Sequence, residues 1–302
     1  MREPPILRML PDEQRLHLHD GPIDLIVEAF GSRAEIRTAY RAAAKRFLTI
    51  LDELCAELPL LRSAARANGA KPRGVIARRM AEAAGSFATE RFITPMAAVA
   101  GAVAEEILLA MTAAANLSRA YVNNGGDIAI HLAAGESFTI GMIERPDRPS
   151  LFGSINLHAS QANRGIATSG WRGRSFSLGI ADAVTVLAER AAMADAAATI
   201  IANAVDLPNH PAIVRVAACE IAPDNDLGER LVTRSVGELT SHEIAQALHS
   251  GAVVARQLIT RGLIGAAAFR LQGQSRVEPQ ALRMMTLIDH RVAESLGSVL
   301  YV

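Results

Sequence analysis

Residues 119–130 read RAYVNNGGDIAI, and this stretch organises the middle of the chain. Two apolar runs, Ala120–Val122 and Ile128–Leu132, lie on either side of Asn124-Gly125-Gly126-Asp127. Asn-Gly and Gly-Gly are favoured two-residue turns, so the pattern predicts a tight β-hairpin. Glycine also allows a backbone to approach a ligand closely, which leaves a binding role for the same turn open.

Short apolar runs bounded by turn residues continue along the chain and predict further strands. We place strands at Leu16–His19, Ile23–Phe30, Arg119–Asn123, Ile128–Leu132, Phe138–Ile143, Ser154–Leu157, Gly165–Thr168, Ser175–Leu178, Ala183–Glu189, Ala212–Ile221 and Leu263–Gly273. Helical spacing and capping residues predict helices at Arg33–Glu57, Val75–Ala84, Met96–Ala115, Ala191–Ala204, Ser241–Arg261 and Glu278–Leu296. Successive short strands combined with helices predict an α+β fold, with an antiparallel or mixed sheet core packed with helices. No linker or repeat interrupts the chain, so we expect a single domain over residues 1–302, with its motifs at 119–205 and a C-terminal helical extension at 275–302.

Acidic and basic residues balance in this 302-residue chain, with 31 of each and a formal net charge of zero. Such a chain has no net field to attract nucleic acid or an anionic membrane, so neither is expected as a partner. The N-terminal residues carry charges without an apolar stretch, unlike a signal peptide or lipoprotein leader. No uncharged apolar run approaches the roughly 18–20 residues that span a bilayer. We therefore expect a cytoplasmic protein; the two cysteines, Cys55 and Cys219, are too few for a disulfide framework.

The segment from Thr94-Pro95 begins with a capping residue and a proline, which is a strong helix start. The helix that follows is apolar around most of its circumference except at Glu105 and Glu106, so we expect it to be central and buried. Small residues in its first turns are typical of close packing, and an anion site at its N-terminus remains open. In the preceding helix, Arg78 and Arg79 are expected to face solvent.

Two further segments carry polar groups suited to a phosphate and a cation. Thr168-Ser169-Gly170 follows an apolar run and precedes Arg172 and Arg174. Hydroxyls, exposed N–H groups and cations can hold a phosphate, but for this segment taken alone we favour a polar turn with solvated arginines. Asp195 and Thr199 lie four apart in an alanine-rich helix and therefore share one face. A carboxylate and a hydroxyl suit Mg²⁺, and an N-cap Asp with an interior Thr is the alternative.

His17 and His19 alternate on one face of the first predicted strand. Two imidazoles at this spacing can bind a metal ion. An exposed strand face explains the pair more simply, and we favour that interpretation.

In this order the three motifs resemble the FAD:protein FMN transferases, the ApbE-like superfamily. That family carries an Asn-x-Gly-Gly-Asp turn, a Thr-Ser-Gly segment with a nearby Arg, and an Asp-Ala-x-Ala-Thr helix. The matching residues here are Asn123, Gly125, Gly126, Asp127, Thr168, Ser169, Gly170, Arg174, Asp195, Ala196, Ala198 and Thr199. The resemblance implies an ApbE-like, T-fold-related architecture and a site for FAD and Mg²⁺, with Asp195 and Thr199 as metal ligands and the turn and Thr-Ser-Gly segments as the flavin-binding residues. It also implies transfer of the FMN half of FAD to a hydroxyl of an acceptor protein.

The chain departs from the family pattern at one functional position. The transferases have a His-x-x-Asp-Pro-x-Thr-Gly segment, whose His is associated with activating the acceptor hydroxyl. Here Gly179 stands in place of that His, and Asp182 matches the Asp. This departure places the chain in a divergent, cytoplasmic branch of the superfamily.

Three functions therefore remain open. The chain is an enzyme that transfers FMN or cleaves the FAD pyrophosphate, a non-catalytic flavin or nucleotide binder, or an enzyme that uses the same scaffold on another small molecule. Asp182 is the candidate catalytic base in the first case, on what should be a strand, because a buried carboxylate can acquire a pKa near neutrality. Its alternative role is to cap a strand or to bind ligand through hydrogen bonds. Assembly as a homo-oligomer is also open.

Overall fold

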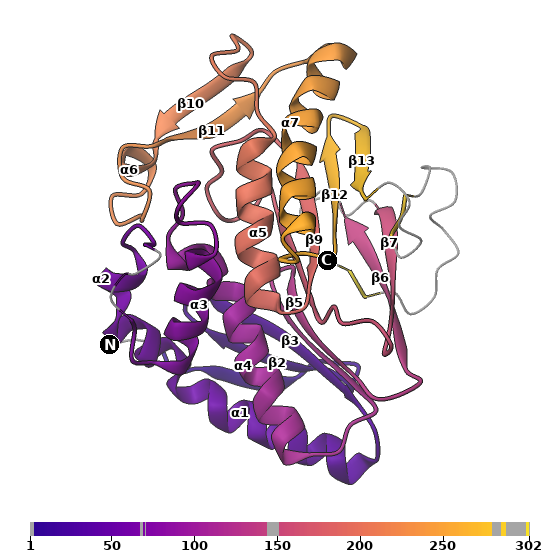
Figure 1. The fold of residues 1–302 in the computed structure, drawn as a ribbon. Helices are drawn as coiled ribbons and strands as arrows, with labels where there is room; N and C mark the ends of the chain where they lie inside the picture. The colour runs from indigo at the N-terminus through magenta and orange to yellow at the C-terminus, as the bar shows by residue number, and fades with distance from the viewer. Residues whose placement is uncertain are drawn as a thin grey trace.

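The computed structural model describes residues 3–66, 69, 71–143, 151–279, 285–287 and 300–301. It combines helices with sheets whose strands are almost all antiparallel, so the predicted α+β class is confirmed. One nine-stranded sheet has helices against one face and a smaller sheet against the other (Figure 1).

The large sheet contains, in spatial order, β1 (Ile6–Met9), β2 (Leu16–Asp20), β3 (Ile23–Phe30), β4 (Arg119–Asn124), β5 (Asp127–Leu132), β8 (Gly165–Ser169), β9 (Ala183–Ala188), β12 (Ala266–Leu271) and β13 (Gln274–Glu278). All of its neighbouring strands are antiparallel. The second sheet has the order β14 (Met285–Leu287), β7 (Leu151–His158), β6 (Ser137–Ile143) and β15 (Leu300–Tyr301). A separate hairpin pairs β10 (Ile213–Ala217) with β11 (Leu231–Val236).

The helices are α1 (Arg33–Ala56), α2 (Leu58–Leu61), α3 (Val75–Gly85), α4 (Val99–Ala114), α5 (Ala191–Ala204), α6 (Ala218–Ile221) and α7 (Ser241–Thr260), and a 3₁₀ turn, η1 (Pro95–Ala98), leads into α4. Two of them begin at predicted caps. The Ser32 hydroxyl accepts a hydrogen bond from the Glu35 N–H at the start of α1. Thr240 and Glu243 form a reciprocal capping box at the start of α7. Each cap satisfies backbone donors that the helix itself leaves unpaired.

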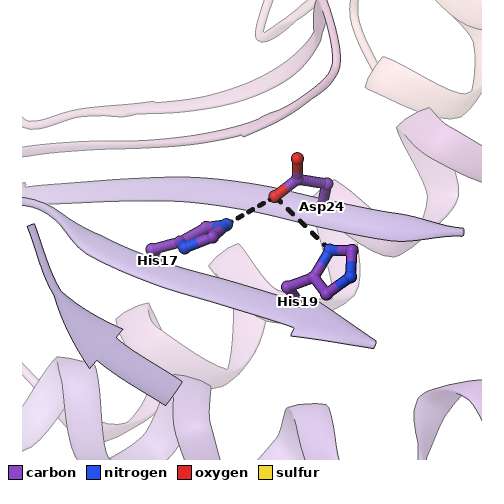
Figure 2. Close-up of side chains that lie close together, drawn as sticks. All are labelled: His17, His19 and Asp24. Atoms are coloured by element: carbon purple, nitrogen blue, oxygen red, sulfur yellow. Dashed lines mark hydrogen bonds and ion pairs between the residues drawn. The ribbon is translucent and has the colours of Figure 1, made fainter. Parts of the chain in front are cut away.

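Strands β2 and β3 show the alternation that assigns side chains to the two faces of the large sheet. Leu18, Leu25 and Val27 are buried against the helices. His17 and His19 therefore project from the opposite face of β2, where both lie near Asp24 of β3 (Figure 2). The predicted shared face of the two histidines is confirmed.

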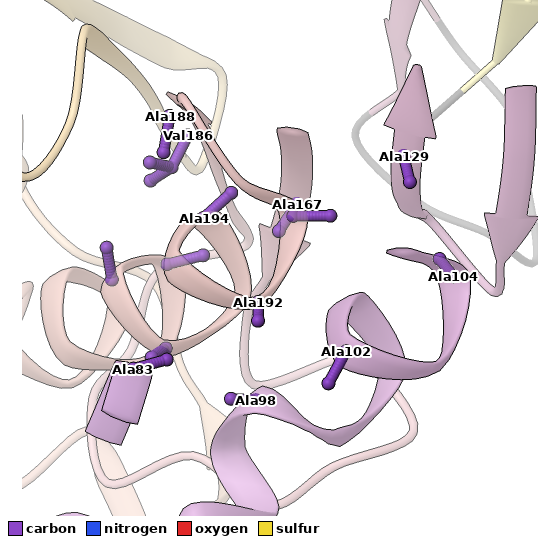
Figure 3. Packing of buried hydrophobic residues seen from close by; sticks show 14 of the residues in the cluster. Ala83, Ala98, Ala102, Ala104, Ala129, Ala167, Val186, Ala188, Ala192 and Ala194 are labelled. Atoms are coloured by element: carbon purple, nitrogen blue, oxygen red, sulfur yellow. The ribbon is translucent and has the colours of Figure 1, made fainter. Parts of the chain in front are cut away.

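Two hydrophobic cores hold the layers together. The larger core lies between the helices and the large sheet, and the smaller one lies between that sheet and β6–β7. In the larger core, α4 and α5 meet through alanines, including Ala98, Ala102, Ala192 and Ala194 (Figure 3). Small side chains bring the two backbones so close that a Cβ on Gly101 would overlap the carbonyl oxygen of Ala191.

The segment Pro95–Ala114 is long and apolar enough to cross a membrane by length and composition alone. In the fold it contacts α1, α5, β4 and β5, as predicted for a central helix. Its two acidic residues also have partners within the fold. Arg79 Nε lies 2.9 Å from Glu105 Oε2, and Arg79 Nη2 lies 3.2 Å from Glu106 Oε2. The expected exposure of Arg79 was therefore wrong, because only 8% of its surface is accessible.

Several predicted boundaries differ from the structure. Residues 175–178 form no strand, and residues 212–221 divide into β10 and the short helix α6. The sequence analysis missed β1, β11 and β13. The expected helix at 278–296 is wrong at Glu278 and Met285–Leu287. The helical extension at 275–302 is wrong at residues 275–278, Met285–Leu287 and Leu300–Tyr301, which are strands that pair with β12, β7 and β6. The other positions of that segment lie outside the described residues, apart from Pro279.

Candidate functional site

The predicted hairpin joins β4 to β5 and presents one edge of the candidate site. Gly125 and Gly126 have φ values of 66° and 111°, in the region that favours glycine, and this is the conformation of a tight two-residue turn. The Asn123 side-chain oxygen accepts a hydrogen bond of 2.8 Å from the Gly126 N–H. A Cβ on Gly125 would overlap the guanidinium group of Arg174, so the turn and Arg174 are in direct contact.

Two carboxylates from different motifs, Asp127 and Asp195, meet beside this turn. Burial raises the pKa of Asp127 well above its usual value, and repulsion from Asp195 raises it further. The Thr168 N–H and the Arg174 guanidinium oppose this shift of the Asp127 pKa. Burial raises the pKa of Asp195 to about 7, against the effect of hydrogen bonds from the backbone N–H groups of Gly101 and Ala100. The site therefore brings together two carboxyl groups whose ionisation is disfavoured by burial, and Arg174 offsets this only in part.

Asp195 also fixes how α4 and α5 meet. Its Oδ2 accepts a 3.0 Å hydrogen bond from the Gly101 N–H in the first turn of α4. In return, Glu105 Oε1 of α4 accepts a 2.9 Å hydrogen bond from the Ala192 N–H in the first turn of α5. Each helix thus supplies a carboxylate to the unpaired N–H groups and positive dipole end of the other. This reciprocal arrangement holds the Asp195 carboxylate in place.

Thr199 lies one turn further along α5 and lines a small cavity of about 30 Å³. Thr94, Asn203 and Asp226 also line this cavity, and the Thr94 hydroxyl donates a hydrogen bond to the Asp226 carboxylate. Asp195 and Thr199 lie four apart in α5 and so share a helix face, as predicted, while Thr199 but not Asp195 lines this cavity.

The Thr168-Ser169-Gly170 segment at the end of β8 divides between the two faces of the sheet. The Thr168 hydroxyl lies 2.8 Å from the hydroxyl of Thr185, on the side of the smaller sheet. Ala167 packs in the core beneath the helices. Ser169 is two residues further along β8 and projects from the same face, so it is on the side of Asp127 and Asp195. Thr168 contributes its backbone N–H to this side, while its hydroxyl is directed away. A Cβ on Gly170 would overlap the carbonyl oxygen of Asp182, which explains the glycine.

Asp182 lies just before β9 and not on a strand as expected. Its Oδ1 accepts hydrogen bonds from Trp171 Nε1 at 3.2 Å and Arg172 Nε at 3.0 Å. Its Oδ2 accepts a 2.6 Å hydrogen bond from the backbone N–H of Gln272. Both oxygens of this buried carboxylate thus tie the 170–174 loop to the β12–β13 hairpin. These contacts, which Asp182 makes just before β9, are all to protein groups, and its roles as a base or as a ligand-binding group stay predictions.

Asp182→Ala is expected to lower the free energy of unfolding by about 2–4 kcal/mol, because Arg172 and the backbone N–H of Gln272 lose a buried acceptor. The indole of Trp171, the single tryptophan of the chain, loses its partner as well, so its fluorescence emission should shift. Urea unfolding and emission spectra measure both effects, with exposed Asp224→Ala as the control. A variant with parental stability and emission contradicts the positioning role.

Gly179, which stands where the related transferases have their His, packs against the end of α5. A Cβ at this position would overlap the carbonyl oxygen of Ala202, and Val205 O would lie 2.8 Å from it. The chain therefore has no room for a side chain there with the present backbone.

Two contributors to the site escaped the sequence analysis. The buried side chain of Asn124 donates from Nδ2 to the Ala100 carbonyl at 3.1 Å, which joins the hairpin to the start of α4. The N–H groups of Ala100 and Gly101 are the second contributor: the sequence analysis left an anion site at this helix start open but did not name the Asp195 carboxylate as the anion. The small residues after Pro95 indicate that another segment can approach this helix start closely. They do not indicate which segment it is.

Comparison with known proteins agrees with the motif pattern. A family model described as AbpE bacteria matches residues 7–277. The chain belongs to this family. The predicted membership of the ApbE-like superfamily is therefore confirmed, and the match extends well beyond the three motifs.

Curated proteins that are similar in sequence to this chain include proteins named UPF0280. One from Methanopyrus kandleri is 40% identical over 149 residues, which are 49% of this chain and 56% of that protein. Another from Methanothrix thermoacetophila is 39% identical over 131 residues, or 43% of this chain and 52% of that protein. The chain thus spans about half the length of these curated relatives. The apo form of flavinyl transferase ApbE from Pseudomonas stutzeri aligns over 93% of this chain and 95% of its own, with a TM-score of 0.45 and 11% identity.

Proposed function

We propose that this protein binds FAD together with Mg²⁺ at the site between the β4–β5 hairpin and the starts of α4 and α5, and that it acts in flavin transfer. The observation that carries the proposal is the pair of part-buried carboxylates, Asp127 and Asp195. The two carboxylates repel each other and have raised pKa values, and a divalent cation bound beside them would remove that repulsion. Membership of the family supports a flavin-related transferase as the class of function.

The donor set fits Mg²⁺. This ion takes oxygen ligands and is commonly held by one or two carboxylates, with substrate phosphates completing its shell. Asp195 and Thr199 would hold the ion. Asp127 is near enough to Asp195 for the two carboxylates to repel each other, so the positive charge of the ion would offset both. When bound, Mg²⁺ would neutralise the pyrophosphate and stabilise the charge that develops on the AMP leaving group.

The protein's own groups would position the dinucleotide. Arg174 lies over Gly125 and supplies a guanidinium group that can pair with a phosphate. Ser169 adds a hydroxyl on the same side of the sheet. Gly126 has open space where a Cβ would be, so a ligand can approach the backbone of the turn. The Thr168 N–H orients Asp127.

A non-catalytic flavin binder is the second candidate function. The observation that favours it is Gly179, where neither a His nor any other side chain fits. Without a group at that position, activation of a Ser or Thr hydroxyl on an acceptor protein has to come from elsewhere in the site. The binding half of the proposal does not depend on that base. A cytoplasmic location, and the lack of a nucleic-acid or membrane partner, are part of the same proposal.

A titration with FAD tests the proposal, because Trp171 is the single tryptophan and belongs to the 170–174 loop that also carries Arg174. FAD should quench its fluorescence, and Mg²⁺ should tighten binding at least about tenfold over a solution containing EDTA, since the cation offsets the charge of both partners. Chromatography of the mixture detects AMP. Release of AMP supports an enzyme, and binding without release supports the second function. FAD binding that is absent, or equal with and without Mg²⁺, contradicts the proposal.

A further inference from the structure

His17, His19 and Asp24 form a cluster on the face of the large sheet opposite the candidate flavin site. His17 and His19 come from β2 and Asp24 from β3, and one ligand atom from each lies within 4.8 Å of the other two (Figure 2). Leu25 pairs with Asn124, and Asn124 pairs with Asp127, so these three residues share the helix-covered face. Asp24 precedes Leu25 and therefore projects from the other face.

We propose that His17, His19 and Asp24 bind a transition-metal ion, with Zn²⁺ as the reference occupant. Imidazole nitrogens suit Zn²⁺, Cu²⁺ and Ni²⁺, whereas Mg²⁺ and Ca²⁺ prefer oxygen ligands. This site and the proposed Mg²⁺ site therefore differ in chemistry as well as in position.

The metal-free geometry is close to what the ion requires. His17 Nε2 lies 2.6 Å from Asp24 Oδ1, and His19 Nδ1 lies 3.8 Å from the same oxygen. Two ligands of a tetrahedral Zn²⁺ stand about 3.3 Å apart, given bonds of about 2.0–2.1 Å. The first distance has to lengthen and the second to shorten, each by less than about 1 Å. The ligand atoms of His17 and His19 lie within 4.8 Å of each other. The exposed fractions of the Asp24 and His19 side chains, 48% and 40%, leave room for such rotations.

The strands position the ligands and the neighbouring arginine orients one of them. His19 is directly opposite Asp24 in the β2–β3 register, and His17 is two residues earlier on the same face. Arg8 Nε donates to His17 Nδ1 at 3.3 Å, so the proton of the neutral ring is on Nε2, facing Asp24. A metal ion would replace that proton and leave the contact with Arg8 intact. Three protein ligands leave a coordination position open to solvent, where water or an anionic small molecule can bind.

Zinc titration of the full chain, with any histidine tag removed and metals stripped by chelator, tests the proposal. We expect one equivalent of Zn²⁺ to bind and to raise the melting temperature. His17→Ala, His19→Ala and Asp24→Asn should each weaken binding at least tenfold, while the exposed strand histidine variant His158→Ala should bind as the parent does. Circular dichroism verifies the fold of each variant, and the part-exposed positions of His19 and Asp24 make loss of folding a remote explanation.

Cu²⁺ bound to the parent provides a second readout, because its electron paramagnetic resonance spectrum should show coupling to two imidazole nitrogens. Loss of one coupled nitrogen in His19→Ala supports the assignment. The proposal is overturned if the parent takes up no Zn²⁺, or if the His17 and His19 variants bind Zn²⁺ as tightly as His158→Ala does.

Discussion

Asp195→Asn is expected to weaken the binding of FAD with Mg²⁺ by about a hundredfold or more, since it removes a charged ligand of the proposed cation. The same variant should stabilise the metal-free protein. Burial holds the pKa of Asp195 at about 7 in the folded chain, against a usual value of 3.8. Above that pH the folded protein must carry a charge that the unfolded chain carries more easily.

The pH dependence of this gain has a definite sign. Between about pH 4 and pH 7 the folded protein binds more protons at Asp195 than the unfolded chain does, so its stability falls as pH rises. Asparagine removes this dependence and can still accept the hydrogen bond from Gly101. At pH 8 the variant should gain about 1–3 kcal/mol in the free energy of unfolding, and near pH 4 the gain should vanish.

Urea unfolding at the two pH values and FAD titration measure these opposite effects. Asp206→Asn is the matched control, because Asp206 is also a partly buried carboxylate with a pKa raised by burial, but it is paired with Arg215. That variant should keep its affinity for FAD, so a loss of affinity confined to Asp195→Asn is assigned to the cation site and not to the removal of a carboxylate in general. If Asp195→Asn is less stable than the parent at pH 8, the ionised Asp195 carboxylate does not destabilise the folded protein, and this part of the account is wrong.

Gly101→Ala should lower the free energy of unfolding by about 3 kcal/mol or more. The added Cβ would overlap backbone atoms of Ala191, and backbone cannot move aside as a flexible side chain can. Separation of α4 from α5 would also break the hydrogen bond between the Gly101 N–H and Asp195. FAD affinity should therefore fall together with stability.

Gly85→Ala is the control for this substitution. Gly85 ends α3, and a Cβ there meets nothing within 4 Å, so alanine should stabilise the protein by about 0.5–1 kcal/mol through its helix propensity. Thermal and urea unfolding of both variants check the pair. A Gly101→Ala variant within about 1 kcal/mol of the parent means that the two helix starts are less closely packed than the structure shows.

Local patterns predicted much of this fold. The hairpin at Gly125-Gly126, the capped helices α1 and α7, and the shared face of Asp195 and Thr199 all follow from residues within a few positions of one another. The strands β1, β11 and β13 were missed because they lie at sheet edges or in a separate hairpin. All residues of β1 are exposed, and the burial in β11 and β13 does not alternate regularly.

Contacts between distant segments were beyond the sequence. The burial of Arg79 depends on Glu105 and Glu106 of another helix, and a local pattern around Arg79 does not reveal them. The direction of the Thr168 hydroxyl depends on which face of β8 is covered by helices. The meeting of Asp127 and Asp195 was implied only by the family resemblance, because three separate motifs have to converge. The binding and catalytic roles of the individual residues stay predictions.

The most direct test of the central claim is a crystal structure of the protein with FAD and Mn²⁺, which takes the place of Mg²⁺ at oxygen ligands and scatters anomalously. We predict an anomalous peak roughly 2.1 Å from a carboxylate oxygen of Asp195, with the FAD pyrophosphate against Arg174. A larger cavity of about 310 Å³, lined in part by Glu105, His131 and Arg164, is the alternative place for a ligand. A flavin bound in that cavity, with no peak at Asp195, would contradict the account.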